Sequence, residues 1–264
     1  MSSIYEAVKK ATVAIVASHP QTFPQRPFTT YGSGFCIHAE GVVVTCAHVF
    51  KAFMDDPNQV RAIQSSGSDA PKTGMMTVPH VIFLGGVEGT DVVMHAVSIT
   101  DAVLVTGFDI ALLRFSRHPP FQQGYPTLQV AEYNELHEMM EVATCGFPLG
   151  DSMHAQLGTV TSSFTKGMIS SIIPAAGVAR KHLKGFQLDL TATNGNSGGP
   201  VFSTATGHVI GILQGGAIHP ETNQVVQGIA KAETIYPIFD DDLINKLLVK
   251  AKATNRMLQT STTS

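Results

Sequence analysis

The sequence has few cysteines, little charge and no long apolar run, and each shortage argues against a class of protein. Its three cysteines are an odd number with no CxxC spacing, which disfavours a disulfide framework and a zinc site. No stretch approaches the roughly 18 consecutive apolar residues of a membrane helix. The formal net charge of -3 gives no electrostatic reason to expect nucleic acid or a membrane as a partner. None of the 11 histidines shows HExxH or other metal-ligand spacing, so neither a metal nor a cofactor is predicted.

The cysteines and the N-terminal segment bear on the cellular compartment. Cys36 and Cys46 could lie on facing strands of one hairpin and form a single bridge, but buried free thiols in a reducing compartment fit better. Lys9-Lys10 and the apolar run 11–17 imitate a signal peptide, although no small-residue cleavage site follows before His19-Pro20. We therefore predict a short helix that leads into a first strand, in a cytoplasmic protein.

Short apolar and β-branched runs, separated by Gly, Pro, Asp and Asn, dominate the chain and indicate an all-β protein. Many short strands with regular turn signals are typical of sandwiches or barrels rather than of βαβ units. A breaker-rich stretch around Pro119-Pro120 divides the runs into two sets. The first set comprises residues 12–17, 34–37, 42–46, 78–84, 92–99 and 110–115, and the second comprises residues 142–145, 158–161, 167–173, 185–190, 200–202, 209–213 and 225–230.

The two sets of strands predict two barrels joined by a linker. We place the first barrel at residues 1–118, the linker at 119–138, the second barrel at 139–238, and a helix with a tail at 239–264. An apolar stripe from Leu243 to Ala251, with acids before it and lysines toward its end, predicts that helix. Residues 51–77, rich in Asp, Ser, Gly and Pro, are predicted to form a surface excursion of the first barrel.

Ser197 is the candidate nucleophile. It lies in Gly195-Asn196-Ser197-Gly198-Gly199-Pro200, whose glycines let the backbone turn sharply and approach a substrate closely. They also let the N–H groups of Gly195 and Ser197 point into one small space, as an oxyanion hole requires. An ordinary glycine-rich turn has the same composition. The nucleophile elbow of an α/β-hydrolase esterase is disfavoured, because the chain continues after Pro200 as a strand and not as a helix.

His48 and Asp109 are the candidates for the general base and its orienting group. His48 ends the run 42–48, and Asp109 heads the apolar run 110–113. A histidine after a strand is more often structural than catalytic, so each residue alone is a moderate signal. A carboxylate at the head of an apolar strand is expensive to bury without a partner, and an imidazole Nδ1–H is such a partner. Together with Ser197, the two residues predict a His-Asp-Ser triad.

The segments Thr45-Cys46-Ala47-His48-Val49, Phe108–Leu113 and Gly195–Pro200, in the order His, Asp, Ser, resemble a chymotrypsin-fold serine peptidase. Finer matches are similar to the HtrA/Deg branch of that family. They are the Gly-Ser-Gly entry at 32–34, the turn at 145–150, the strand at 165–170 and the approach to the nucleophile at 187–194. The resemblance runs from about Val8 to about Ala230.

This resemblance implies two six-stranded antiparallel β-barrels followed by a C-terminal helix. It assigns the catalytic roles to His48, Asp109 and Ser197, with the oxyanion held by Gly195 and Ser197. The residues that it implies for substrate binding are Thr191, Leu213, Gln214 and Gly215. Thr191 would lie near the floor of the primary specificity pocket, and because it is uncharged we expect a small or medium apolar P1 residue.

The resemblance also implies properties beyond the triad. Asn196 replaces the aspartate that receives a freed N-terminus in digestive members, so activation by that ion pair is not expected. The peptide-binding PDZ module of HtrA proteins is not expected in this chain. Relatives are often trimers built through N-terminal segments, so a homo-oligomer is a candidate, with Phe23, Phe28 and Tyr31 either at its interface or capping the first barrel.

The sequence therefore predicts a serine endopeptidase that acts on polypeptides through an acyl-enzyme. Two alternatives share the fold. One is a catalytically silent peptide-binding or chaperone module, which the complete set of triad residues disfavours. The other is a self-processing peptidase of viral type, which Met1 and the HtrA-like segments disfavour.

Overall fold

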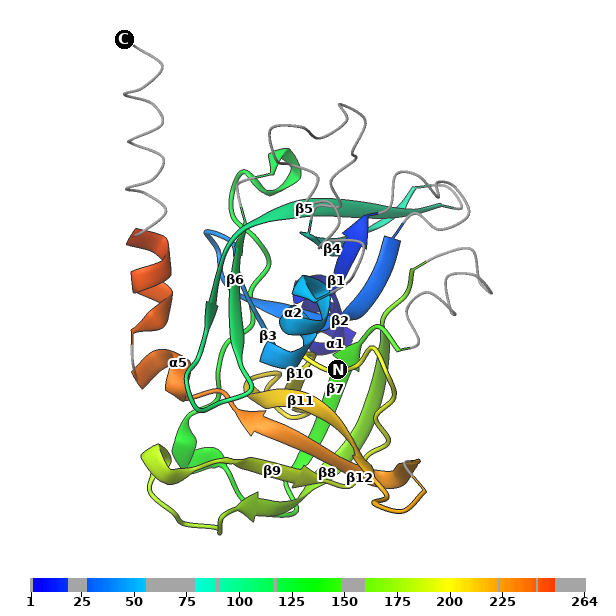
Figure 1. Cartoon of the computed structure of the whole chain (residues 1–264). Coiled ribbons are helices and arrows are strands. Elements are labelled where there is room, and N and C mark those ends of the chain that lie inside the picture. The colour runs from blue at the N-terminus through cyan, green and yellow to red at the C-terminus, as the bar shows by residue number, and fades with distance from the viewer. Residues whose placement is uncertain are drawn as a thin grey trace.

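A computed structural model describes residues 2–18, 28–55, 79–88, 91–115, 118–148, 160–222, 224–240 and 242–249. Two closed barrels, one above the other in Figure 1, make up the body of the molecule. Each has six strands, and every strand pairs antiparallel with its neighbours. The predicted fold class is therefore confirmed.

The first barrel closes in the order β1-β2-β3-β6-β5-β4. Its strands are β1 (Thr12–Ser18), β2 (Phe28–His38), β3 (Val42–Thr45), β4 (Pro79–Glu88), β5 (Asp91–Leu104) and β6 (Ala111–Phe115). The second barrel closes in the order β10-β11-β12-β9-β8-β7. Its strands are β7 (Glu141–Gly146), β8 (Ser163–Ile173), β9 (Gly185–Leu188), β10 (Pro200–Ser203), β11 (Val209–Ile218) and β12 (Val225–Thr234).

The segment between the barrels contains two short 3₁₀ turns, Pro119–Phe121 and Tyr133–Glu135, and a third, Arg180–His182, precedes β9. The core of the first barrel is continuous with part of the second, since Phe35 and Leu113 belong to the same buried cluster as Phe202 and Ile212. A second cluster fills the rest of the second barrel around Phe186. Because apolar packing joins the barrels, side chains that face each other across their junction are held in a fixed relation.

Helices precede the first strand, follow β3 and follow the last strand. The predicted N-terminal helix is present as α1 (Ser2–Ala11), and its Tyr5 ring packs edge-on against Phe164 of the second barrel. After α5 (Pro237–Asp240), residues 243–249 form the predicted C-terminal helix, which buries Leu247 and Leu248 in the shared core. The sequence did not predict α2 (Ala47–Met54), which occupies the start of the expected excursion; residues 56–78 lie outside the described part.

One predicted strand is not found. Residues 160–162 are not in a strand, because β8 begins at Ser163, so the strand expected at 158–161 is wrong over its described part.

Cys36, Cys46 and Cys145 are buried free thiols, which excludes the bridge considered between Cys36 and Cys46. Within the described residues, no helix is long and apolar enough to cross a membrane.

The N-terminal aromatics divide between the two roles considered for them. Tyr31 packs its ring edge-on against Phe53 of α2, with 5.5 Å between centroids, which fits a cap on the first barrel. Phe23 and the side chain of Phe28 lie outside the described residues.

Candidate active site

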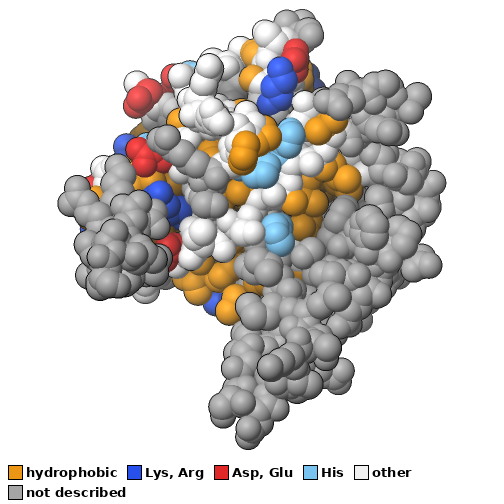
Figure 2. Space-filling view, turned by 90° about the horizontal axis from the view of Figure 1, so that it is seen from above, with side chains coloured by type: hydrophobic (Ala, Val, Ile, Leu, Met, Phe, Trp, Pro, Cys, Tyr) orange, Lys and Arg blue, Asp and Glu red, His pale blue; other side chains and the backbone are white. Residues whose placement is uncertain are grey.

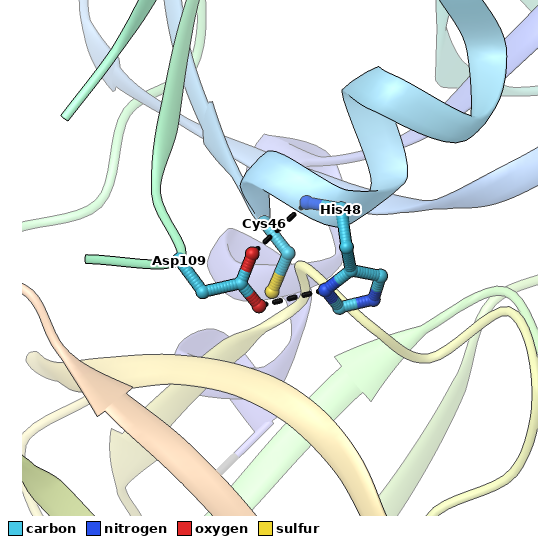
Figure 3. Close-up of side chains that lie close together, drawn as sticks. All are labelled: Cys46, His48 and Asp109. Carbon is cyan, nitrogen blue, oxygen red and sulfur yellow. Dashed lines mark hydrogen bonds and ion pairs between the residues drawn. The ribbon is translucent and has the colours of Figure 1, made fainter. Parts of the chain in front are cut away.

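The pairing of β3 with β6 brings His48 and Asp109 together. Thr45 pairs with Ala111 at the end of this ladder. His48, in the first turn of α2, and Asp109, in the turn before β6, therefore lie at the same edge of the first barrel (Figure 3). Asp109 Oδ2 is 2.7 Å from His48 Nδ1, and Asp109 Oδ1 accepts the backbone N–H of His48 at 2.9 Å. Both carboxylate oxygens thus hold the histidine.

The Asp109 carboxyl has a pKa below its ordinary value. Burial is the largest influence and acts to raise the pKa, but the hydrogen bonds from the His48 ring and backbone, with the charge of His48, outweigh it. Asp109 is therefore ionised at neutral pH and accepts the proton on Nδ1, which leaves Nε2 as the free ring nitrogen. The His48 side chain is 50% exposed, so that nitrogen is accessible to a reacting group.

Cys46 lies beside this pair and raises the question of a metal ion. Its Sγ, His48 Nδ1 and an Asp109 oxygen lie within 4.8 Å of one another. The separation of 2.7 Å between Nδ1 and Oδ2 is that of a direct hydrogen bond. Cys46 donates its S–H to the Leu213 carbonyl at 3.3 Å, and burial raises the pKa of the thiol well above its ordinary value. A protonated thiol and a proton-sharing pair do not fit a metal centre.

Ser197 faces the same junction from the second barrel. Its loop requires glycine, because Gly195 and Gly198 have φ angles of 95° and 88°. The Ser197 hydroxyl donates to the backbone carbonyl of Gln214 at 2.7 Å. No hydrogen bond joins Ser197 to His48 among the described residues. The three predicted catalytic residues thus border one junction, with the hydroxyl bonded to the Gln214 carbonyl and not to the imidazole.

The predicted oxyanion donors have unused N–H groups. Among the described hydrogen bonds, none uses the backbone N–H of Gly195 or of Ser197, whereas Asn196 N–H bonds to the Thr193 carbonyl at 3.1 Å and Gly198 N–H to the Leu213 carbonyl at 2.7 Å. Asn196 is 4% exposed, so its side chain points into the protein. Two unused donors on one tight loop suit the binding of a developing negative charge.

Ser33, on β2, holds this loop from the first barrel. Its hydroxyl donates to the Gly195 carbonyl at 2.6 Å and accepts the Phe147 N–H at 2.9 Å. Its backbone N–H bonds to the Ser197 carbonyl at 2.8 Å, and its carbonyl accepts the Thr45 hydroxyl at 2.7 Å. Sequence reasoning noted the Gly-Ser-Gly motif but assigned no role to this serine. Its position between two glycines was the available signal.

The predicted substrate-binding residues separate into two groups. The Thr191 hydroxyl donates to Gln227 Oε1 at 3.2 Å, so its polar group is engaged by β12. Leu213 is fully buried, and its backbone N–H and carbonyl already bond to Gly199 and Gly198. Gln214 and Gly215 are partly exposed, and they are the residues of this stretch that can meet a substrate.

One cavity of the described part lies away from these residues. About 670 Å³ of space opens between α1, β4 and residues 120–126, lined by aromatic rings and by Lys9 and Lys10. The outer face of the first barrel carries apolar and histidine side chains together (Figure 2). Lys10 is paired with Glu6 at 2.7 Å, and the cavity lining has no serine or cysteine. The arrangement for nucleophilic chemistry is therefore at the junction of the barrels.

Two six-stranded barrels with a histidine and an aspartate on the first and a serine loop on the second define the chymotrypsin class of proteins. The family described as "Trypsin-like peptidase domain" matches residues 32–212, and the chain belongs to this family. No curated protein matches the chain. Among solved structures, "Crystal structure of Deg5" matches with a TM-score of 0.56 and 19% identity, covering 90% of each chain. This match shows that the chain shares the two-barrel fold of that protein.

Proposed function

We propose that the chain is a serine endopeptidase in which Ser197 attacks the peptide carbonyl, His48 is the general base and Asp109 orients the imidazole. The observation that carries the proposal is the double hold of Asp109 on His48, at 2.7 Å and 2.9 Å. A carboxylate that fixes Nδ1–H leaves Nε2 able to take a proton, and it stabilises the imidazolium that forms.

The first step is a reorientation of the nucleophile. The Ser197 hydroxyl leaves the Gln214 carbonyl and turns to Nε2 of His48. The Gln214 carbonyl then becomes available to the backbone N–H of a substrate strand that lies along β11, as in β-augmentation. Substrate binding and release of the hydroxyl are thereby coupled, because the substrate N–H and the Ser197 hydroxyl compete for the Gln214 carbonyl.

The chemical steps follow from the groups at the junction. His48 takes the Ser197 proton as Oγ bonds to the carbonyl carbon, and the N–H groups of Gly195 and Ser197 bind the oxyanion. The imidazolium then donates its proton to the leaving amine, and an acyl-enzyme forms. Water activated by His48 hydrolyses the acyl-enzyme and restores the serine.

The primary specificity pocket is proposed to accept small or medium apolar P1 residues. Thr191 carries no charge, and its hydroxyl is already bonded to Gln227, so no counter-ion for Arg or Lys stands at this position. A peptide library should give cleavage after apolar residues. A profile dominated by Arg or Lys would refute this assignment.

The test of the proposed function is labelling with a fluorophosphonate, which reacts with an activated serine. We expect wild-type protein to be labelled at Ser197, shown by peptide mapping, and to cleave an unfolded protein substrate. Ser197→Ala should abolish labelling and lower turnover by about 10⁴–10⁶. Hydrolysis and labelling retained in this variant would overturn the assignment.

A second candidate function is peptide binding without catalysis. The hydrogen bond from the Ser197 hydroxyl to Gln214 favours it, because in that position the serine is not activated by His48. In this case, wild-type protein would bind unfolded polypeptides but would not be labelled by the fluorophosphonate, whatever the polypeptide concentration. Ser197→Ala would bind the same polypeptides as tightly as wild type.

The assembly state is a separate proposal. A homo-oligomer, trimeric as in HtrA relatives, is expected from the resemblance. Light scattering of the purified full chain should give a mass about three times the 28.1 kDa of one chain. A mass equal to that of one chain would contradict the proposal.

A further inference from the structure

Glu233, on β12 of the second barrel, is hydrogen-bonded to Asp109 of the candidate triad, although the proposed mechanism gives it no part. Its Oε2 accepts the backbone N–H of Asp109 at 3.2 Å, across the junction of the barrels. The same oxygen accepts Nε2–H of the Gln214 side chain at 3.0 Å, from the neighbouring strand β11. A half-buried carboxylate therefore connects a residue of each barrel.

The two partners of Glu233 belong to the two halves of the site. Asp109 holds His48 through both carboxylate oxygens. Gln214 holds the Ser197 hydroxyl through its backbone carbonyl. One oxygen atom of Glu233 thus fixes the backbone of the first residue and the side chain of the second. A shift of either partner would change the relation between the imidazole and the serine.

The surroundings of Glu233 favour its role as an acceptor over a role as a charge. Its pKa lies above its ordinary value because burial disfavours the ionised form; the nearby Asp109 charge acts in the same direction, while the Asp109 N–H and the Lys184 charge oppose it. A second negative charge next to Asp109 would also repel it. Both hydrogen bonds, by contrast, need only one oxygen with two lone pairs.

We propose that Glu233 is a positioning residue. By accepting one hydrogen bond from Asp109 and one from the Gln214 side chain, it fixes the strand that is proposed to receive the substrate relative to the His48–Asp109 pair. This proposal rests on the proposed function, which supplies the reaction that this alignment serves. Reacting groups displaced by about 1 Å lose about 10²-fold in rate, so a junction residue of this kind has a large effect without touching the substrate.

Two substitutions separate the acceptor from the charge. Glu233→Ala removes the oxygen, whereas Glu233→Gln keeps one carbonyl oxygen for both hydrogen bonds and removes the charge. We expect Glu233→Ala to lower kcat by about 10–10²-fold, with a smaller change in KM, because alignment and not binding is lost. Glu233→Gln should restore kcat close to that of wild type.

Glu138→Ala is the matched control. Glu138 lies in the turn before β7, and its Oε1 accepts the backbone N–H of Ile172, on β8 of the second barrel, at 3.2 Å. Loss of a carboxylate-to-backbone hydrogen bond is thus common to both alanine variants, and melting temperatures establish that each is folded. Kinetics of Glu233→Ala equal to those of Glu138→Ala, or Glu233→Gln as impaired as Glu233→Ala, would overturn the proposal.

An NMR measurement, which does not depend on turnover, tests the role of Glu233 separately from the proposed function. The proton that His48 Nδ1 shares with Asp109 should give a low-field resonance in the NMR spectrum, because it lies in a short, charge-assisted hydrogen bond. We expect Glu233→Ala to shift or broaden this resonance, and Glu233→Gln and Glu138→Ala to preserve it. An unchanged resonance in Glu233→Ala would contradict positioning even if the protein is active. If wild-type protein is not labelled by the fluorophosphonate, the result would contradict the proposed function alone.

Discussion

The two halves of the candidate site differ in how far they are assembled. On the first barrel, His48 and Asp109 are joined by two hydrogen bonds and need no movement to act as a base and its orienting group. On the second barrel, the backbone N–H groups of Gly195 and Ser197 take part in none of the described hydrogen bonds, but the Ser197 hydroxyl bonds to the Gln214 carbonyl. The difference fits the proposal that a substrate displaces the hydroxyl from the Gln214 carbonyl.

The origin of this difference is in the local structure. The first half rests on the register of β3 with β6, which a closed barrel fixes. The second half rests on a loop in which Gly195 and Gly198 have positive φ angles, and Ser33 supports this loop from the other barrel. Strand pairing fixes the first half, whereas the position of the Ser197 hydroxyl in the second half depends on the rotamer of one side chain.

The largest effect is expected from breaking the assembled half. Asp109→Asn should lower kcat by about 10⁴, because the amide no longer fixes the Nδ1–H tautomer of His48. Steady-state kinetics and the rate of fluorophosphonate labelling measure the change. Asp101→Asn, on β5 of the same barrel, is the control and should keep wild-type activity. A loss of less than tenfold in Asp109→Asn would show that the pair at 2.7 Å has no catalytic part.

The next largest effect is expected on stability, at the point where Gly198 of the serine loop packs against the first barrel. A Cβ atom at Gly198 would lie 2.1 Å from the Ser33 carbonyl oxygen and 2.3 Å from Thr45 Oγ1, at a φ of 88°. Gly198→Ala should therefore cost about 1–3 kcal/mol of steric strain beyond the ~1–2 kcal/mol of the left-handed backbone. Gly177→Ala, at a φ of 75° with no atom within 4 Å, has only the backbone cost. Urea denaturation compares the two, and equal destabilisation would contradict the close contact of the barrels at this glycine.

A smaller effect is expected at Ser33. Ser33→Ala leaves the Gly195 carbonyl and the buried Phe147 N–H without their partner, which should cost about 1–3 kcal/mol of stability. It should also slow labelling of Ser197, because the oxyanion loop loses its support. Ser203→Ala, at a buried serine on β10 of the second barrel, is the control and should leave labelling unchanged. Labelling of Ser33→Ala at the wild-type rate would show that the loop does not depend on this bond.

The smallest effect is in the pH dependence of stability. The pKa of Asp109 is lower in the folded state than in the unfolded chain, so its contribution is present above pH ~4 and is lost as the pH falls through the lower folded value. His48, Cys46 and Glu233 face this carboxyl, and Glu233 has the opposite dependence because its pKa is raised. Melting temperatures should fall less steeply on acidification in Asp109→Asn than in wild type. Parallel curves would contradict a lowered pKa.

The sequence predicted the parts of the molecule that depend on local patterns. Short apolar and β-branched runs predicted most strands, and the glycines around Ser197 predicted the loop, since each signal lies within a few residues. The helix α2 was missed because its segment runs into a polar stretch that looked like a loop. The strand predicted at 158–161 failed because a short apolar run does not reveal where pairing begins.

Contacts between distant segments were beyond sequence reasoning. Glu233 lies 124 positions from Asp109, and no spacing rule connects the two. The orientation of the Ser197 hydroxyl toward Gln214 is a choice of rotamer, which no motif encodes. The Ser33 hydroxyl had a local signal in its flanking glycines, but its partner Gly195 is 162 positions away.

The most direct test of the proposed triad is a crystal structure of the protein after reaction with a fluorophosphonate. We expect phosphorus bonded to Ser197 Oγ, an oxygen of the adduct about 2.7–3.1 Å from the N atoms of Gly195 and Ser197, and the Gln214 carbonyl released. An adduct on another residue, or an oxygen turned away from both amides, would contradict it.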